Sequence, residues 1–221
     1  MGETITLTAD DGFTLSAYLA RPDGRPKGAV IVVQEIFGVN GHIRRDADGF
    51  ARAGYVALAP AVFDRLEKGV ELAYDQKGME KGRDLVMRLG FDNALKDIRA
   101  AANALWQYGR VGVVGYCWGG SVAWTCATRL GLPAVGYYGG RTVALMHERP
   151  QAPVELHWGE KDHLIPMADV TRFRYVHETV PNFVYPVGHG FNCDDRPGSY
   201  DKAAADLARG RTLDFFARHV G

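Results

Sequence analysis

The sequence has few cysteines, no excess of either charge and no long apolar run, and each shortage excludes a class of protein. Three cysteines among 221 residues are too few for a disulfide framework. Lysine plus arginine and aspartate plus glutamate each number 26, so no basic excess is available for a nucleic-acid partner. No apolar stretch approaches the ~20 residues of a membrane-spanning helix, and the N-terminus does not resemble a signal peptide. We expect a cytoplasmic protein without nucleic-acid or membrane partners, in which a thiol can stay reduced.

What is present is typical of a globular α/β protein. Apolar residues make up 47% of the chain and charged residues 24%, both close to the average for soluble domains. A length of 221 residues is routine for one α/β domain, and no linker or repeat interrupts the pattern. We therefore predict a single domain over residues 1–221.

Short apolar segments alternate with amphipathic ones along almost the whole chain. The expected strands are residues 5–8, 13–20, 29–34, 55–59, 111–114, 134–138, 154–158 and 183–186. The expected helices are residues 42–53, 93–108, 121–130, 167–176 and 203–219. Residues 66–82 are charged and interrupted by glycine, and we expect an irregular excursion there. Such alternation predicts the α/β class: a mainly parallel central sheet with helices on both faces.

Residues 115–120 carry the most specific chemical pattern. They read Gly-Tyr-Cys-Trp-Gly-Gly, directly after an apolar strand and at the start of a helix. This is a nucleophile elbow with Cys117 where serine is usual. Gly115 and Gly119 let the strand and the helix approach closely, and the helix N-terminus favours a thiolate. The pattern predicts that Cys117 is a nucleophile.

A nucleophile of this kind needs a base and an acid that orients the base. Asp162 follows the strand at 154–158, and His189 follows the strand at 183–186. The chain order nucleophile, acid, histidine is that of α/β-hydrolases. Because the carboxyl ends of parallel strands meet at one edge of a sheet, we expect the three side chains to converge. Glu160 is the alternative acid.

The other histidines and cysteines receive structural assignments. His42 and His177 are expected on helix surfaces, and His157 is expected to pack within a strand. Cys126 is assigned to the core and Cys193 to the rim of the site. These residues lack the spacing of a zinc site, so we expect no metal and no cofactor.

The loop after an early strand should supply the second half of an oxyanion hole. Residues 34–40 read Gln-Glu-Ile-Phe-Gly-Val-Asn, and Gly38 permits an unusual backbone conformation. The backbone N–H groups of Ile36 and Trp118 are the predicted oxyanion donors. Glu35 is unusual, because a carboxylate that ends an apolar strand seldom serves stability, and near Cys117 it opposes thiolate formation.

Together these motifs resemble the dienelactone hydrolase family (carboxymethylenebutenolidases) of the α/β-hydrolase superfamily, over nearly the whole chain. Further points of resemblance are residues 134–139, 159–162, 188–191 and 211–216. The resemblance implies an α/β-hydrolase fold and a hydrolase that opens a lactone or cleaves a small carboxylic ester. It implies a catalytic triad, an oxyanion hole and a glutamate that holds the resting thiol. The matching residues here are Cys117, Asp162 and His189 for the triad, Ile36 and Trp118 for the hole, and Glu35 for the thiol contact.

The family's substrates carry a carboxylate that arginines bind, and here the chain departs from the pattern. The position four residues after the triad histidine holds Cys193 instead of arginine. For the other arginine, Lys81 and Arg83 are the nearest candidates. Phe37 and Phe191 complete the predicted substrate-binding set.

Two alternatives stay open. One is a broader carboxylesterase or thioesterase that acts on other small acids, which the departure at Cys193 favours. The other is a non-catalytic or redox-sensing relative, in which Cys193 resolves an oxidised Cys117. In the main hypothesis the partner is a small lactone or ester, and the protein is a monomer or a small homo-oligomer.

Overall fold

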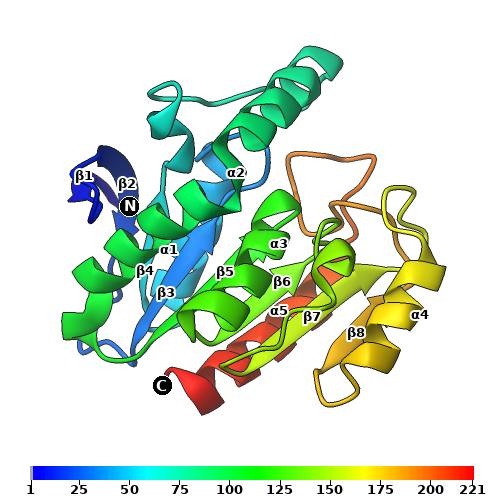
Figure 1. Cartoon of the computed structure of the whole chain (residues 1–221). Coiled ribbons are helices and arrows are strands. Elements are labelled where there is room, and N and C mark those ends of the chain that lie inside the picture. Colours follow the sequence, from blue (N-terminus) through cyan, green and yellow to red (C-terminus); the bar gives the residue numbers. More distant parts are fainter. Residues whose placement is uncertain (1) are drawn as a thin grey trace.

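The computed structural model describes residues 2–221, so Met1 of the predicted domain lies outside the described residues. A sheet in the strand order β1-β2-β4-β3-β5-β6-β7-β8 forms its centre (Figure 1). The strands are β1 Glu3–Thr8, β2 Thr14–Ala20, β3 Ala29–Val33, β4 Val56–Pro60, β5 Val111–Tyr116, β6 Ala134–Tyr137, β7 Val154–Gly159 and β8 Asn182–Tyr185. β1 and β2 form an antiparallel hairpin, β2 pairs antiparallel with β4, and all further pairs are parallel. The predicted mainly parallel sheet is confirmed, with antiparallel strands at one edge only.

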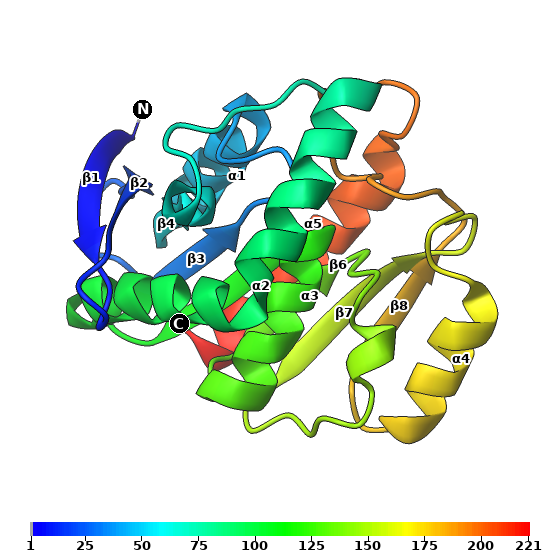
Figure 2. The same ribbon diagram turned by 45° about the horizontal axis from the view of Figure 1, so that its top comes forward.

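Helices cover both faces of this sheet, as Figure 2 shows. The helices are α1 Gly41–Arg52, α2 Gln76–Leu105, α3 Trp118–Thr125, α4 Met167–Val176 and α5 Lys202–His219, with short helical turns η1 Val62–Arg65, η2 Trp106–Tyr108, η3 Cys126–Leu130 and η4 Val143–Leu145. α1 packs against α5 through Phe50 and Phe216, whose rings lie 5.7 Å apart. α3 packs against α4 through Trp124 and Phe173, at 4.9 Å. No helix within the described residues is long and apolar enough to cross a membrane.

The buried strands follow from their composition. Every residue of β3 and β4 is buried, as expected for parallel strands with helices on both faces. Asparagine or aspartate caps helices α1, α2 and α5. The side chains of Asn40 and Asp201 accept hydrogen bonds from the first turns of α1 and α5. Local sequence therefore specifies both the strands and the helix starts.

Helix α2 differs from the expectation. The sequence predicts an irregular excursion over residues 66–82, which is correct for residues 66–75, but α2 begins at Gln76 and bends at Gly90, where φ is 68° and ψ is 170°. The glycines that suggest breaks are points of close approach instead. A Cβ on Gly82 would lie 2.2 Å from the carbonyl oxygen of Ile36. Residues 76–89 thus form a helix that packs on the loop after β3.

Candidate active site

Cys117 lies at a strained turn between β5 and α3. Its φ is 55°, a value that is rare for a residue other than glycine, and such strain costs about 1–3 kcal/mol. Two glycines make the turn possible. A Cβ on Gly115 would lie 1.9 Å from the carbonyl oxygen of Gly119, and one on Gly119 would lie 2.4 Å from that of Gln34. The predicted strand–turn–helix geometry is present, with the thiol at the N-terminus of α3.

His189 connects Cys117 to Asp162. Its Nε2 lies 3.2 Å from the Cys117 sulfur, and its Nδ1 lies 2.7 Å from Oδ2 of Asp162. The other oxygen of Asp162 accepts a hydrogen bond from the Leu164 N–H at 2.8 Å, which fixes the carboxylate. The Tyr138 ring packs edge-on against His189 at 5.0 Å. The structure thus brings together the three side chains that the chain order suggested.

The electrostatics of His189 favour a charged imidazole. Burial by itself lowers the pKa of a histidine. Here the charge of Cys117 and the hydrogen bonds to Asp162 and Cys117 outweigh burial and raise the pKa of His189 to about 10. His189 therefore keeps its proton at neutral pH, in contact with the sulfur. This arrangement suits a thiolate–imidazolium pair.

A cavity of about 310 Å³ opens above these residues. Its lining is mostly apolar, with arginines among it: Ile36, Phe37, Met79, Arg83, Val86, Met87, Cys117, Trp118, Gly140, Arg141, Leu164, His189 and Arg196. Of the predicted substrate-binding residues, Phe37 and Arg83 are in this set. The predicted oxyanion donors Ile36 and Trp118 lie beside Cys117 in the same cavity.

The structure puts the other predicted substrate-binding residues outside the cavity, which corrects the sequence prediction. Lys81 forms an ion pair with Glu67 at 2.7 Å on the surface. Phe191 is fully buried and packs against Tyr138 at 5.3 Å. Cys193 is also fully buried, because its loop turns the thiol inward.

Arg141, Arg196 and one face of α2 line the cavity although the sequence did not predict them there. No carboxylate among residues 2–221 forms an ion pair with Arg83, Arg141 or Arg196. The guanidinium of Arg196 lies 5.7 Å from the centre of the Tyr74 ring. Met79 and Arg83 have the i, i+4 spacing of one helix face, a signal that the sequence contains. Arg141 follows the predicted strand at 134–138, and Arg196 lies in the loop after His189, so both are near strand ends where a site is expected. The sequence does not show which side chains of these loops face the cavity.

Glu35 does not make the contact that the family resemblance implied. It is 1% exposed, and neither carboxylate oxygen hydrogen-bonds to any residue from 2 to 221. The side chain that contacts the Cys117 sulfur is His189. Burying a carboxylate without a hydrogen-bond donor destabilises the folded protein. The burial of Glu35 therefore calls for a compensating charge nearby.

The structure also tests the remaining assignments. Cys126 is buried in the core as predicted, and burial raises the pKa of its thiol. His157 packs within the sheet, also as predicted. The surface positions predicted for His42 and His177 are wrong, because both side chains are buried. His177 lies under the loop before β7, where its Nε2 contacts the Met146 carbonyl oxygen at 2.8 Å.

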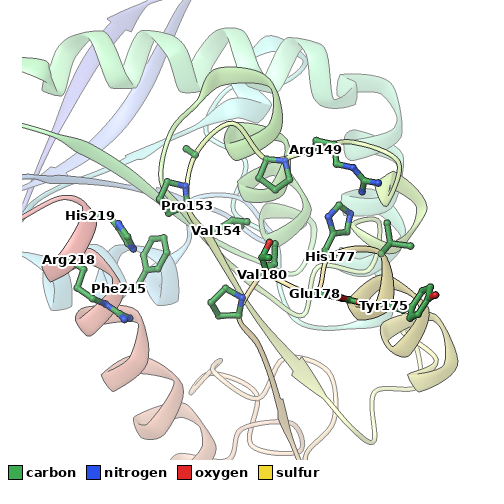
Figure 3. A pocket seen from close by; sticks show the side chains of 15 residues that line it. Arg149, Pro153, Val154, Tyr175, His177, Glu178, Val180, Phe215, Arg218 and His219 are labelled. Atoms are coloured by element: carbon green, nitrogen blue, oxygen red, sulfur yellow. The ribbon is translucent and has the colours of Figure 1, made fainter.

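A larger cavity, of about 760 Å³, lies elsewhere. Figure 3 shows its lining at the start of β7, between the last turns of α4 and α5. No cysteine or serine lines it. Arg218 and His219 lie in the last turn of α5, where basic side chains interact favourably with the negative end of the helix dipole. The smaller cavity around Cys117 is therefore the candidate site.

Comparison with known proteins agrees with this geometry. The model of the family described as "Dienelactone hydrolase family" matches residues 15–220. The chain belongs to the dienelactone hydrolase family. The carboxymethylenebutenolidase of Pseudomonas putida is 30% identical in an alignment of 227 positions, which covers 97% of this chain and 96% of the relative.

Comparison with solved structures agrees with the family assignment. One named as a dienelactone hydrolase from Klebsiella pneumoniae is 30% identical, covers 99% of this chain and 100% of its own, and has a TM-score of 0.86. An esterase from Pyrococcus furiosus has a TM-score of 0.70 at 15% identity, over 100% of this chain and 93% of its own, a likeness in fold alone. The predicted α/β-hydrolase fold is confirmed, and the protein is a dienelactone hydrolase-like hydrolase.

Proposed function

We propose that this protein hydrolyses lactones or small carboxylic esters through Cys117, His189 and Asp162. One observation carries the proposal: His189 lies 3.2 Å from the Cys117 sulfur and 2.7 Å from Asp162, beside an open cavity. A nucleophile, a base and an orienting acid in hydrogen-bond contact are what acyl transfer requires.

In the first step the Cys117 thiolate attacks the carbonyl carbon of the substrate. The carbonyl oxygen becomes negative and binds to the backbone N–H groups of Ile36 and Trp118. Neither N–H donates a hydrogen bond to another residue in the range 2–221. When the acyl–oxygen bond breaks, His189 gives its proton to the leaving alkoxide. In a lactone this alcohol stays attached to the acyl group.

In the second step water hydrolyses the thioester. His189, now neutral, accepts a proton from the attacking water, and Cys117 leaves as a thiolate. Asp162 keeps Nδ1 of His189 protonated and stabilises the imidazolium as it forms again. One water is consumed, and the products are an acid and an alcohol.

The cavity lining indicates the substrate class. Arg83, Arg141 and Arg196 supply positive charge that no carboxylate of the described residues neutralises by an ion pair. Met79 and Leu164 supply apolar surface. Guanidinium groups bind carboxylates well. The best-fitting substrate is a mainly apolar lactone or ester with an additional carboxylate.

Hydrolysis by Cys117→Ala and Cys126→Ala variants tests the proposal. The substrates are a dienelactone that carries a carboxylate, an uncharged p-nitrophenyl acyl ester and an acyl thioester. We expect Cys117→Ala to lower kcat/KM by about 10³-fold or more on every substrate that is turned over. Cys126→Ala should retain hydrolysis. Equal residual activity in the two variants contradicts the proposal.

The substrate panel also separates the alternatives. Faster cleavage of the acyl ester or the thioester than of the lactone would favour the broader esterase or thioesterase. A redox role instead predicts a Cys117–Cys193 disulfide after mild peroxide treatment, which mass analysis detects.

A further inference from the structure

The loop of residues 190–201, directly after His189, is bound to helix α1 by side chains. Asn192 donates a hydrogen bond to Asp46 at 3.2 Å. Arg45 donates to Asp194 at 2.8 Å and to Asp195 at 2.6 Å. His42 completes the set, with Nδ1 3.1 Å from Oδ1 of Asp194. Because this loop also carries Arg196, α1 influences both the proposed base and the proposed substrate-binding arginine.

Among the side chains of α1 that contact this loop, His42 differs from Arg45 because it is buried. The Arg45 side chain is 49% exposed, so solvent weakens its ion pairs. The His42 side chain is 2% exposed. Its second ring nitrogen, Nε2, makes no hydrogen bond with any of residues 2–221, and Oδ2 of Asp46 lies 3.7 Å away. The Asp194 side chain is 50% exposed, so it is the burial of His42 that distinguishes this pair from that of Arg45, and a partly buried pair is screened less than an exposed one.

The groups that face His42 are mostly negative. Asp46 lies on the same helix, Asp194 and Cys193 lie on the loop after His189, and Glu35 lies two residues after β3. Burial opposes a charge on the ring, but Cys193, Asp46 and Glu35 outweigh it and raise the pKa of His42 to about 10. The uncharged ring of Tyr116 in β5 also faces His42, with the two ring centres 6.1 Å apart. His42 is therefore a buried imidazolium at neutral pH.

This cation accounts for Glu35. Its carboxylate is buried without a hydrogen-bond donor in the described residues, and the charge interaction with His42 gives it a partner through the interior. Glu35 directly precedes Ile36, a proposed oxyanion donor. His42 thus contacts Asp194 on the loop of the proposed base and interacts by charge with Glu35, next to the proposed oxyanion hole.

We propose that His42 is a positioning residue: its buried imidazolium holds Asp194, and with it the loop of residues 190–201, while it balances the charge of Glu35. The proposal rests on the proposed function, because the positions at stake are those of His189 and Ile36. Cys193 of this loop stands where the family resemblance implied an arginine, and in this chain His42 supplies a positive charge nearby.

NMR titration of the His42 ring nitrogens tests the charge without any turnover. We expect His42 to stay charged through neutral pH and to lose its proton near pH 10. In a Glu35→Gln variant, the midpoint should fall by about one pH unit, because one attracting charge is gone. Titration of wild-type His42 near the ordinary value of about 6.5 overturns the proposal, whatever the substrate of the enzyme is.

A double-mutant cycle tests the positioning role. We expect His42→Gln and Asp194→Asn each to lower kcat/KM on an activated aryl ester by about tenfold, and the double variant to lose no more than His42→Gln alone. Arg45→Gln, which removes the exposed partner of the same Asp194, should cost about twofold or less. Losses that multiply to about a hundredfold overturn the proposal. If His42→Gln does not fold, the titration still decides.

Discussion

At the scale of single residues, Cys117, His189 and Asp162 are arranged as the family resemblance implied, whereas the arginines near them are not. Cys193 occupies the position where the resemblance implied an arginine, and its thiol is fully buried. Arg196, three residues later, reaches the cavity instead. Its guanidinium lies 6.0 Å from the centre of the Phe37 ring. A cation held over an aromatic face near Cys117 is well placed to bind the carboxylate of a substrate.

Arg196→Gln should therefore raise KM for a lactone that carries a carboxylate by about tenfold or more, because one charge-assisted contact is worth about 1.5–3 kcal/mol. The methyl ester of the same lactone, which lacks the charge, should change little. Steady-state kinetics on the two substrates measures this difference. Arg172→Gln is the control, since Arg172 is exposed and pairs with Asp169. If both substrates lose equally, Arg196 does not bind the carboxylate.

The residue scale also shows what the sequence can reveal about a site. Cys117, Asp162 and His189 could be found because each follows a strand, and carboxyl ends of parallel strands meet at one edge. The burial of His42 could not be found, because it depends on the loop that packs over α1. The sequence also does not show that Arg141, which follows Gly140 in the cavity lining, points its side chain toward the cavity at Cys117, because that depends on how the loop after β6 packs.

At the scale of elements, helix α2 is the part that the sequence described least well. Its first segment, residues 76–89, supplies Met79, Arg83 and Met87 to the cavity. The second segment, residues 91–105, continues after the bend at Gly90. The bend has φ 68° and ψ 170°, a conformation that is nearly restricted to glycine. The direction of the first segment, and with it one wall of the cavity, depends on this glycine.

Gly90→Ala should destabilise the protein by about 1–3 kcal/mol and raise KM, because α2 must change its direction at the bend. The reactivity of Cys117 toward iodoacetamide should stay unchanged, since α2 does not contribute to the contact with His189. Gly210→Ala in α5 is the matched control, in an ordinary helical position with open space around the added Cβ. It should stabilise by about 0.5–1 kcal/mol. Equal unfolding midpoints in urea for the two variants contradict the role of the bend.

At the scale of the whole molecule, a buried ion pair connects the antiparallel edge of the sheet to α2. Arg65 in η1 donates to both carboxylate oxygens of Asp97 at 2.9 Å and also to Asp11 at 2.9 Å. Asp97 is fully buried. Burial raises the pKa of Asp97 to about 6, although Arg65 opposes this shift. The unfolded chain has an aspartate pKa of about 3.9.

The sign of the pH effect follows from these two values. Between pH 4 and 6 the folded protein binds more protons at Asp97 than the unfolded chain does. The contribution of Asp97 to the free energy of unfolding therefore decreases as pH rises through this interval. Above pH 6 the Asp97 carboxylate is charged, and the folded protein then depends on Arg65 to compensate this buried charge.

Arg65→Met should lower the free energy of unfolding by about 3 kcal/mol or more at pH 7, because it leaves a buried charge unpaired. At pH 5 the loss should be smaller, since Asp97 can bind a proton instead. Urea unfolding at the two pH values measures the difference. Arg172→Met, in an exposed pair, should change stability by about 0.5 kcal/mol or less at both. An equal loss at pH 5 and pH 7 for Arg65→Met contradicts the prediction.

The sequence by itself determined the α/β class, the strand–helix alternation and the candidate set of Cys117, Asp162 and His189. Those features depend on local patterns: continuous apolar runs form buried parallel strands, and short turns after them bring side chains to one edge. Only the tertiary structure decided that residues 76–89 form a wall of the cavity, that Arg196 faces it and that His42 is buried in contact with Asp194. These features depend on which distant segments pack together, and a charged or glycine-rich segment alone does not show its partner.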